Sequence, residues 1–170
     1  GYVTGARRTA CPPDSRGWRR AVHAAETILH HELALVVLAL LVFAASWNQP
    51  NQTGWWTYLV LWRMRLSAKL NLFLGVRNLS ENFLPPHLAC LQSYFTRRAW
   101  NWLMPVSLLA ASAVALPLWL AVPEQPADGF AATSLSLVAG LLTLAVIEHL
   151  FMVVPLPTGW LWKWGLRAKA

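Results

Sequence analysis

The sequence contains too little charge to be that of a soluble domain. Asp, Glu, Lys and Arg make up 12% of its 170 residues, about half of their share in a typical soluble domain. A soluble protein with so few charged residues could not cover its surface. The hydrophobic residues, 56% of the chain, come in blocks and not in an amphipathic pattern. The composition therefore predicts a membrane protein.

Acidic residues are scarcer than basic ones, which gives a formal net charge of +7. Such a balance can indicate nucleic-acid binding, but here Lys and Arg lie at the ends of the apolar blocks, among Trp residues. This placement is typical of side chains at the level of phospholipid headgroups. We therefore expect membrane lipids, and no nucleic acid, among the partners.

Cysteine is rare, and patterns of catalytic or metal-ligating residues are missing from the sequence. Cys11 and Cys90 fall in segments that we assign below to the cytoplasm, where thiols stay reduced, so we expect both to be free. The sequence has no CxxC pair, Cys/His zinc spacing, nucleophile elbow, phosphate loop or zincin motif. We expect a protein that is not an enzyme and has no metal site.

Four apolar blocks are long enough to cross the hydrocarbon core of a bilayer, which takes roughly 20 residues. They are residues 27–47, 55–75, 103–122 and 130–154. Short turns containing Pro and Gly separate the first block from the second and the third from the fourth. We therefore predict an all-α polytopic membrane bundle, one domain over residues 1–170, with four transmembrane helices.

The basic residues outside these blocks all lie on one side of the predicted membrane. Residues 1–26 contain five Lys or Arg, residues 76–102 three and residues 155–170 three, whereas the turns at 48–54 and 123–129 contain none. By the positive-inside rule the three basic segments are cytoplasmic, so both visible ends should lie in the cytoplasm.

Two of the cytoplasmic segments have the pattern of helices that lie on the membrane surface. Residues 10–25 carry Trp18 next to arginines, and residues 87–102 place Leu88 and Leu91 at helical spacing ahead of further arginines. We expect an interfacial amphipathic helix in each segment.

Ionisable residues inside the blocks are the candidate functional groups, because each costs about 2.5–3.5 kcal/mol on insertion scales. The topology places Glu32, Lys69 and Glu148 at a common depth, roughly 8–9 Å below the inner interface at 1.5 Å per residue. Arg65 would lie about 6 Å deeper on the same face of its helix as Lys69. We expect these four residues to form an intramembrane charged layer.

The chemistry of this layer has three interpretations. It could be a structural ion cluster that holds the bundle together, a pigment or metal site, or a path for protons or ions. Neutral imidazole ligates the magnesium of bacteriochlorophyll, so the histidines beside the layer are the candidate ligands for the second interpretation. These are His30, His31 and His149.

Several stretches of the sequence resemble one known family. The stretches are YVTGARRTACP at 2–12, HHELAL at 30–35, PNQTGWWTYLVLWRMR at 50–65, SAKLNLFLGVRNLSENFLPPHL at 67–88 and IEHLFMVVPLP at 147–157. They resemble the photosynthetic complex assembly protein 2 family, the PuhE-like proteins of purple-type phototrophic bacteria. The similar stretches extend over nearly the whole chain.

The resemblance implies a biological process that composition could not. It implies a factor that helps to assemble the photosynthetic reaction centre and its light-harvesting antenna, or tunes pigment supply to them. The location implied is the bacterial inner membrane, cytoplasmic or intracytoplasmic. Reaction-centre and light-harvesting subunits are the implied partners, and bacteriochlorophyll or carotenoid could be bound by contact. No catalytic or cofactor-binding residue can be carried over from the family.

Family members are longer than this chain, and their genes accompany that of the reaction-centre H subunit. Residues 1–5 have the composition of a segment that follows an earlier helix or strand. We therefore expect the sequence to be the C-terminal part of a longer protein. Two alternatives stay open: a permanent accessory subunit of a reaction-centre–light-harvesting complex, and a membrane enzyme or pigment carrier in bacteriochlorophyll metabolism.

Two regions are candidate contact surfaces. The connection after the second block is either a rigid re-entry loop or a docking surface for another protein. Its candidate docking residues are Arg77, Asn78, Glu81 and Asn82. The third and fourth blocks are rich in small residues, which allow close helix approach, and we expect them to pack against partner helices. These residues are Ala110, Ala111, Ser112, Ala113, Ala139 and Gly140.

Overall fold

The computed structural model describes residues 10–79, 84, 86–127 and 129–155. Within them the chain is helical, and the only strand-like pairing is an isolated parallel bridge between Val76 and Arg97. The elements are α1 (Trp18–Ser46), α2 (Thr53–Leu74), the 3-10 helix η2 (Pro86–Tyr94), α3 (Leu103–Ala121) and α4 (Phe130–Val153). The predicted all-α class is confirmed for the described part.

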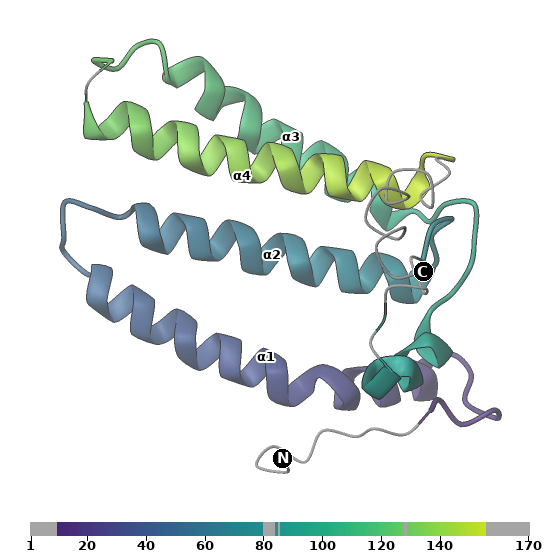
Figure 1. Cartoon of the computed structure of the whole chain (residues 1–170). Coiled ribbons are helices and arrows are strands. Elements are labelled where there is room, and N and C mark those ends of the chain that lie inside the picture. The colour runs from purple at the N-terminus through teal and green to yellow at the C-terminus, as the bar shows by residue number, and fades with distance from the viewer. Residues whose placement is uncertain (1–9, 80–83, 85, 128, 156–170) are drawn as a thin grey trace, which may run out of the picture.

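The four α-helices lie side by side, with α2 between α1 and α4 (Figure 1). α3 packs mainly against α4, and it also touches α2. Three of them, α1, α3 and α4, are long and apolar enough to cross a membrane. α2 has 22 residues but contains Arg63, Arg65 and Lys69. A multi-pass membrane protein is therefore supported, and the span at 55–75 stays a prediction.

Most helix ends agree with the predicted spans within two residues, and the start of α1 is the exception. This helix begins at Trp18, nine residues before the predicted start at 27. No Pro or Gly follows Gly17 until the helix has ended, so nothing interrupts it at the membrane surface. The separate interfacial helix predicted within 10–25 is therefore wrong: residues from Trp18 onward are the first turns of α1.

The amphipathic helix predicted over 87–102 is only partly present. The structure has η2, which ends at Tyr94, and an extended segment follows it. The backbone N–H of Val76 donates to the carbonyl of Thr96, and that of Arg98 donates to the carbonyl of Val76, both at 3.1 Å. These long-range hydrogen bonds hold residues 96–98 against the end of α2, where a continuing helix could not make them.

The buried apolar residues lie where α2, α3 and α4 meet. One cluster joins Ala111 and Ala115 of α3 to Leu142 of α4, with α2 side chains packed against it. Small residues bring α3 and α4 close together, as is usual between membrane helices. α1 contributes little to this core, since Ala39 is the only residue of that helix that is buried. Something other than apolar packing must attach α1 to the bundle.

Adding bulk where the helices are closest should destabilise the bundle. Ala139 of α4 is fully buried, so Ala139→Leu should lower the free energy of unfolding by about 1–3 kcal/mol through overpacking. Ala113→Leu, on an exposed position of α3, is the matched control and should change it little. The measurement is unfolding of the purified protein in detergent with increasing dodecyl sulfate. Equal stability of the two variants would contradict this description of the core.

Candidate functional site

Glu32 of α1 and Lys69 of α2 form an ion pair, in which the ammonium group donates to Oε1 of the carboxylate. The other carboxylate oxygen accepts from the indole N–H of Trp62 at 3.1 Å. The side chains of Glu32 and Lys69 are 17% and 31% exposed. Two donors from α2 thus satisfy both carboxylate oxygens of one acid of α1.

The residues of α2 that contact α1 lie on one face of the helix. Tyr58 donates to the backbone carbonyl of Leu35 at 2.6 Å, and Trp62 and Lys69 follow four and eleven residues later. At 3.6 residues per turn these intervals bring a side chain back to nearly the same direction. The polar face of α2 therefore supplies the attachment of α1 that apolar packing does not.

A second group of polar residues, which the sequence patterns did not predict, lies at the opposite face of α2. It surrounds a histidine of α4. His149 of α4 is fully buried; its Nδ1 lies 2.9 Å from the carbonyl of Ala145 and its Nε2 lies 3.0 Å from Oγ of Ser67. Ser67 also donates to Ser107 of α3 at 2.8 Å. The hydroxyl of Ser67 thus connects α2 to both α3 and α4. Both ring nitrogens of His149 have a hydrogen-bond partner.

Two asparagines extend this buried network toward the start of α3. Asn71 donates to the carbonyl of Ser67 at 3.0 Å, and Asn101 donates to the carbonyl of Gly75 at 2.7 Å. Oδ1 of Asn101 accepts from the backbone N–H groups of Leu103 and Met104, which α3 itself cannot satisfy. The i, i+4 spacing of Ser67 and Asn71 was a signal for this polar face in the sequence.

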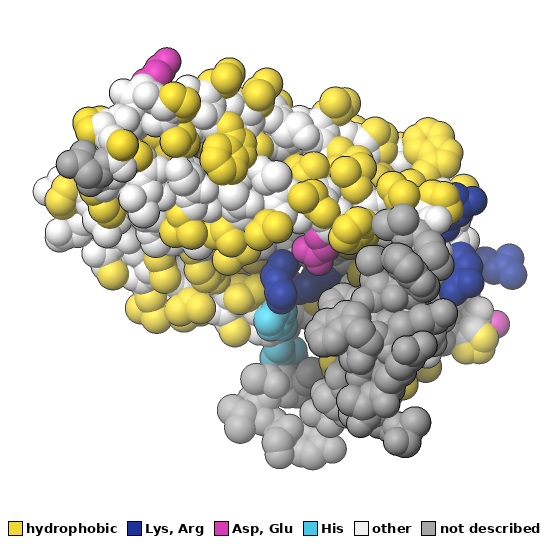
Figure 2. Space-filling view, turned by 45° about the horizontal axis from the view of Figure 1, so that its top comes forward, with side chains coloured by type: hydrophobic (Ala, Val, Ile, Leu, Met, Phe, Trp, Pro, Cys, Tyr) yellow, Lys and Arg dark blue, Asp and Glu magenta, His cyan; other side chains and the backbone are white. Residues whose placement is uncertain are grey.

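The other members of the predicted layer do not join the ion pair. Arg65 and Glu148 are exposed, and in the described part of the chain neither makes an ion pair or hydrogen bond. Figure 2 shows acidic, basic and histidine side chains gathered on one face amid hydrophobic surface. The layer is therefore one internal ion pair with further charges on the outside of the helices.

The three histidines that were candidate pigment or metal ligands do not lie together. His30 and His31 are exposed on α1, whereas His149 is enclosed on the far side of α2. Among the described residues no group of three His, Cys, Asp or Glu side chains is placed to hold a metal ion. An axial ligand to a pigment needs a free ring nitrogen, which favours His30 and His31 over His149.

The candidate docking loop is described only in part, since Glu81 and Asn82 lie outside the described residues. Asn78 is used internally: its side chain donates to the carbonyls of Phe151 at 2.7 Å and Val154 at 2.6 Å. These carbonyls belong to the end of α4, so Asn78 caps that helix. Arg77 is exposed and is the member that remains available for a partner.

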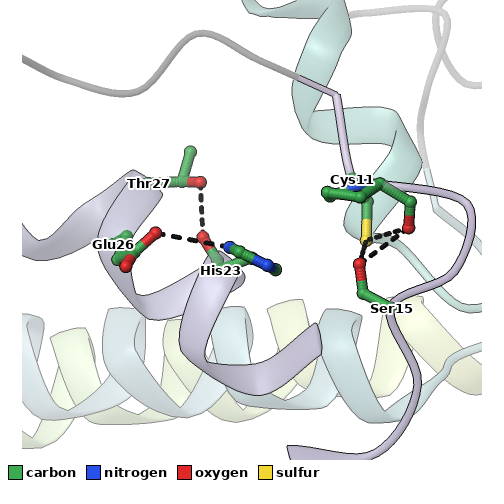
Figure 3. A network of polar contacts seen from close by, with 6 residues as sticks. Cys11, Ser15, His23, Glu26 and Thr27 are labelled. Atoms are coloured by element: carbon green, nitrogen blue, oxygen red, sulfur yellow. Dashed lines mark hydrogen bonds and ion pairs between the residues drawn. The ribbon is translucent and has the colours of Figure 1, made fainter. Parts of the chain in front are cut away.

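The two cysteines lie near each other at the segment that leads into α1. The backbone N–H of Cys11 donates to Ser93 at 2.8 Å, and Ser93 donates to the carbonyl of Cys90 at 2.7 Å. Both cysteines are free, as predicted. Figure 3 shows Cys11 beside Ser15, and His23 beside Glu26 in the first turns of α1, with 3.4 Å between Nδ1 and Oε2.

Arg20 joins this segment to the end of α2. Its guanidinium donates to the carbonyl of Tyr94 at 2.8 Å and to the hydroxyl of Thr96 at 2.9 Å. It also lies over the ring of Phe73, 5.0 Å from the centroid. The contact fixes the start of α1 against the connection between α2 and α3.

Comparison with known proteins places the chain in a family. The chain belongs to the family described as protein of unknown function DUF3623, which it matches over residues 1–170. It is 38% identical over 167 residues to a Rhodobacter capsulatus protein named "Uncharacterized 30.4 kDa protein in puhA 5'region". The similar region covers 98% of this chain and 60% of that protein. No solved structure matches the chain.

Removing one partner of the ion pair should cost more than removing both. In Lys69→Met the carboxylate of Glu32 loses its cation in a low-dielectric environment, and unfolding should become easier by about 1–3 kcal/mol, less than for a fully buried pair. The double variant Glu32→Gln/Lys69→Met should recover much of this loss. A double-mutant cycle of unfolding free energies in detergent measures the coupling. Additive effects of the two changes would refute a direct interaction.

Proposed function

We propose that this member of the DUF3623 family is an accessory or assembly factor of the bacterial photosynthetic reaction centre and its light-harvesting complex, embedded in the inner membrane. The observation that carries the proposal is the relative's name, which places its gene in the puhA 5' region. This position agrees with the gene neighbourhood, beside the gene of the reaction-centre H subunit, that the PuhE-like resemblance implies. The chain spans 60% of that relative, so the activity of the whole protein belongs to the proposal.

In this proposal α2 is the fourth span. It lies between α1 and α4 along most of its length: Thr53 is 2.6 Å from Ser134 near one end, and Ser67 is 3.0 Å from His149 toward the other. A helix fixed in this way between two apolar helices must lie at their depth. Lys69 is then neutralised by Glu32, and the uneven distribution of Lys and Arg puts both visible ends in the cytoplasm.

The outer face of α3 is the surface best suited to a partner helix. Ala111 and Ala139 are buried in the contact between α3 and α4, which leaves Ala110, Ser112 and Ala113 exposed. Small residues let another helix approach closely, and the aliphatic side chains beside them supply dispersion contacts. Exposed neighbours on this helix include Val106, Leu109, Val114, Leu116 and Leu120. We assign this face to reaction-centre or light-harvesting subunits.

A pigment carrier is the second candidate function, and the exposure of His30 and His31 favours it. Apolar side chains next to them, Leu29 and Leu33, are also exposed. In this alternative a histidine nitrogen ligates bacteriochlorophyll and the ring lies along α1. Purified protein would then be coloured, and His30→Leu/His31→Leu would lose the colour while His149→Leu would keep it.

Photocrosslinking in native membranes tests the assembly proposal. A benzophenone amino acid at position 113 of the full-length protein, expressed in a phototrophic host, should crosslink to reaction-centre or light-harvesting subunits identified by mass spectrometry. The matched control is position 139, which is buried between α3 and α4 and should crosslink only within the chain. Deletion of the gene should reduce photosynthetic growth and pigment content. Normal growth and pigment content, with no crosslink to these subunits, would rule the proposal out.

A further inference from the structure

A cavity lies where the segment before α1 meets η2. Its volume is about 430 Å³, within the range of about 300–1,000 Å³ that is usual for ligand pockets. The residues of its wall that matter here are Ser15, Arg16 and Arg20, at the start of α1, and Ser93 of η2. On the topology proposed above, this end of the bundle faces the cytoplasm.

The charged side chains that line the cavity are both arginines. Asp14, the one acid between residues 10 and 25, is not part of the wall, and no other described acid lines it. Arg16 is exposed and has no hydrogen bond or ion pair with a described residue. Two positive charges in one cavity repel each other, and an anion between them relieves the repulsion. The cavity therefore favours an anionic ligand.

Arg20 is held in place by the rest of the structure and still has donors to spare. Nη2 of its guanidinium donates to the carbonyl of Tyr94 at 2.8 Å and to the hydroxyl of Thr96 at 2.9 Å. The N–H groups of Nε and Nη1 make no hydrogen bond with a described residue. Arginine uses such donors in pairs to bind the oxygens of phosphate and carboxylate groups.

Internal hydrogen bonds fix the wall of the cavity. The backbone N–H of Cys11 donates to Oγ of Ser93 at 2.8 Å, and the hydroxyl of Ser15 donates to the carbonyl of Pro12 at 2.7 Å. Figure 3 shows Ser15 beside Cys11 in this segment. Ser93 in turn donates to the carbonyl of Cys90, so the donors left for a ligand belong to the arginines. A wall that is already ordered lowers the entropy lost on binding.

The cavity lies at the level where α2 ends. Arg20 lies over the ring of Phe73, in the last turn of α2, 5.0 Å from its centroid. Trp18, at the start of α1, is 81% exposed, and Trp side chains favour the headgroup level of a membrane. Farther along α1, apolar side chains such as Leu29 and Leu33 are exposed. A lipid with its headgroup in the cavity could therefore lay its acyl chains along this helix.

We propose that the cavity binds the phosphate group of an anionic phospholipid of the cytoplasmic leaflet, between Arg16 and Arg20. The proposal rests on the membrane orientation in the proposed function and not on its photosynthetic role. The non-bridging oxygens of a phosphodiester accept paired hydrogen bonds from guanidinium groups, and its negative charge offsets theirs. Basic pockets on the cytoplasmic side of membrane helices bind anionic headgroups for the same reason. A lipid held there would connect the start of α1 to η2.

Binding of phosphatidylglycerol to the full-length protein tests this site. The tagged protein is immobilised in a neutral detergent at physiological ionic strength, and retention of radiolabelled phosphatidylglycerol is measured as the lipid is titrated. Arg16→Gln should raise the Kd at least about fivefold, because charge-assisted hydrogen bonds are lost. Unlabelled phosphatidylcholine with the same acyl chains has no net charge and should compete at least about fivefold more weakly than phosphatidylglycerol.

The matched control is Arg19→Gln. Arg19 is exposed in the first turn of α1 but does not line the cavity. The substitution removes the same charge close by, and salt screens the exposed group, so the Kd should change less than about twofold. Circular dichroism of both variants checks that the helices are formed.

Inorganic phosphate distinguishes a lipid headgroup from a soluble phosphate. At millimolar concentration it should leave the retained lipid in place, because the acyl chains add to the affinity of the lipid. Displacement of the lipid would show that the ligand is a soluble anion, and would overturn the lipid assignment.

Two further results would overturn the site. An equal loss of affinity in Arg16→Gln and Arg19→Gln would show only a general attraction to the basic segment. Unchanged affinity in Arg16→Gln would show that the cavity does not hold the phosphate group. Neither result depends on crosslinking of α3 to photosynthetic subunits, so the two proposals can fail separately.

Discussion

The attachment of α1 to the rest of the bundle depends on one ion pair, between Glu32 of α1 and Lys69 of α2. Burying leucine against a neighbouring helix gains little in a bilayer, because lipid tails are equally apolar. α1 has a single buried residue, Ala39. Hydrogen bonds from Trp62 and Tyr58 accompany the ion pair, and together these polar contacts determine which face of α1 meets α2.

Polar contacts also determine the packing on the other side of α2. Ser67 and Asn71 connect it to α3 and α4 through Ser107 and His149, while the apolar cluster at Ala111 and Leu142 fills the space beside them. The helix that is least apolar is therefore the one that organises the others. Its charges weaken its signature as a membrane span, yet they provide the contacts that position its neighbours.

The parts of this structure that follow from local chemistry could be predicted, and the parts set by distant contacts could not. α3 and α4 begin and end where expected, because Pro and Gly mark the turn between them. Depth along the predicted spans put Glu32 and Lys69 at one level, and in the structure these two side chains are in contact. Depth gives no direction around a helix, however, and Glu148 and Arg65, which were predicted to share the same layer, are exposed on the outside of their helices.

Two further features required the tertiary structure. The chain after η2 is held by hydrogen bonds of Val76 with Thr96 and Arg98, which lie at least 20 residues away in sequence, and no local pattern reveals such pairing. The network around His149 uses Ser and Asn residues that look unremarkable within apolar stretches. Their i, i+4 spacing was visible, but the partners on α3 and α4 depend on which helices become neighbours.

Accessibility of the two ends of α2 tests most directly whether this polar helix spans the membrane. In a chain with Cys11 and Cys90 changed to Ser, single cysteines are placed at Asn51 and Arg77, at either end of α2, and treated with a membrane-impermeant maleimide in intact spheroplasts. If α2 spans the membrane, position 51 should be labelled from outside, and position 77 only after permeabilisation. Labelling of both positions from the same side would show that α2 does not cross the membrane.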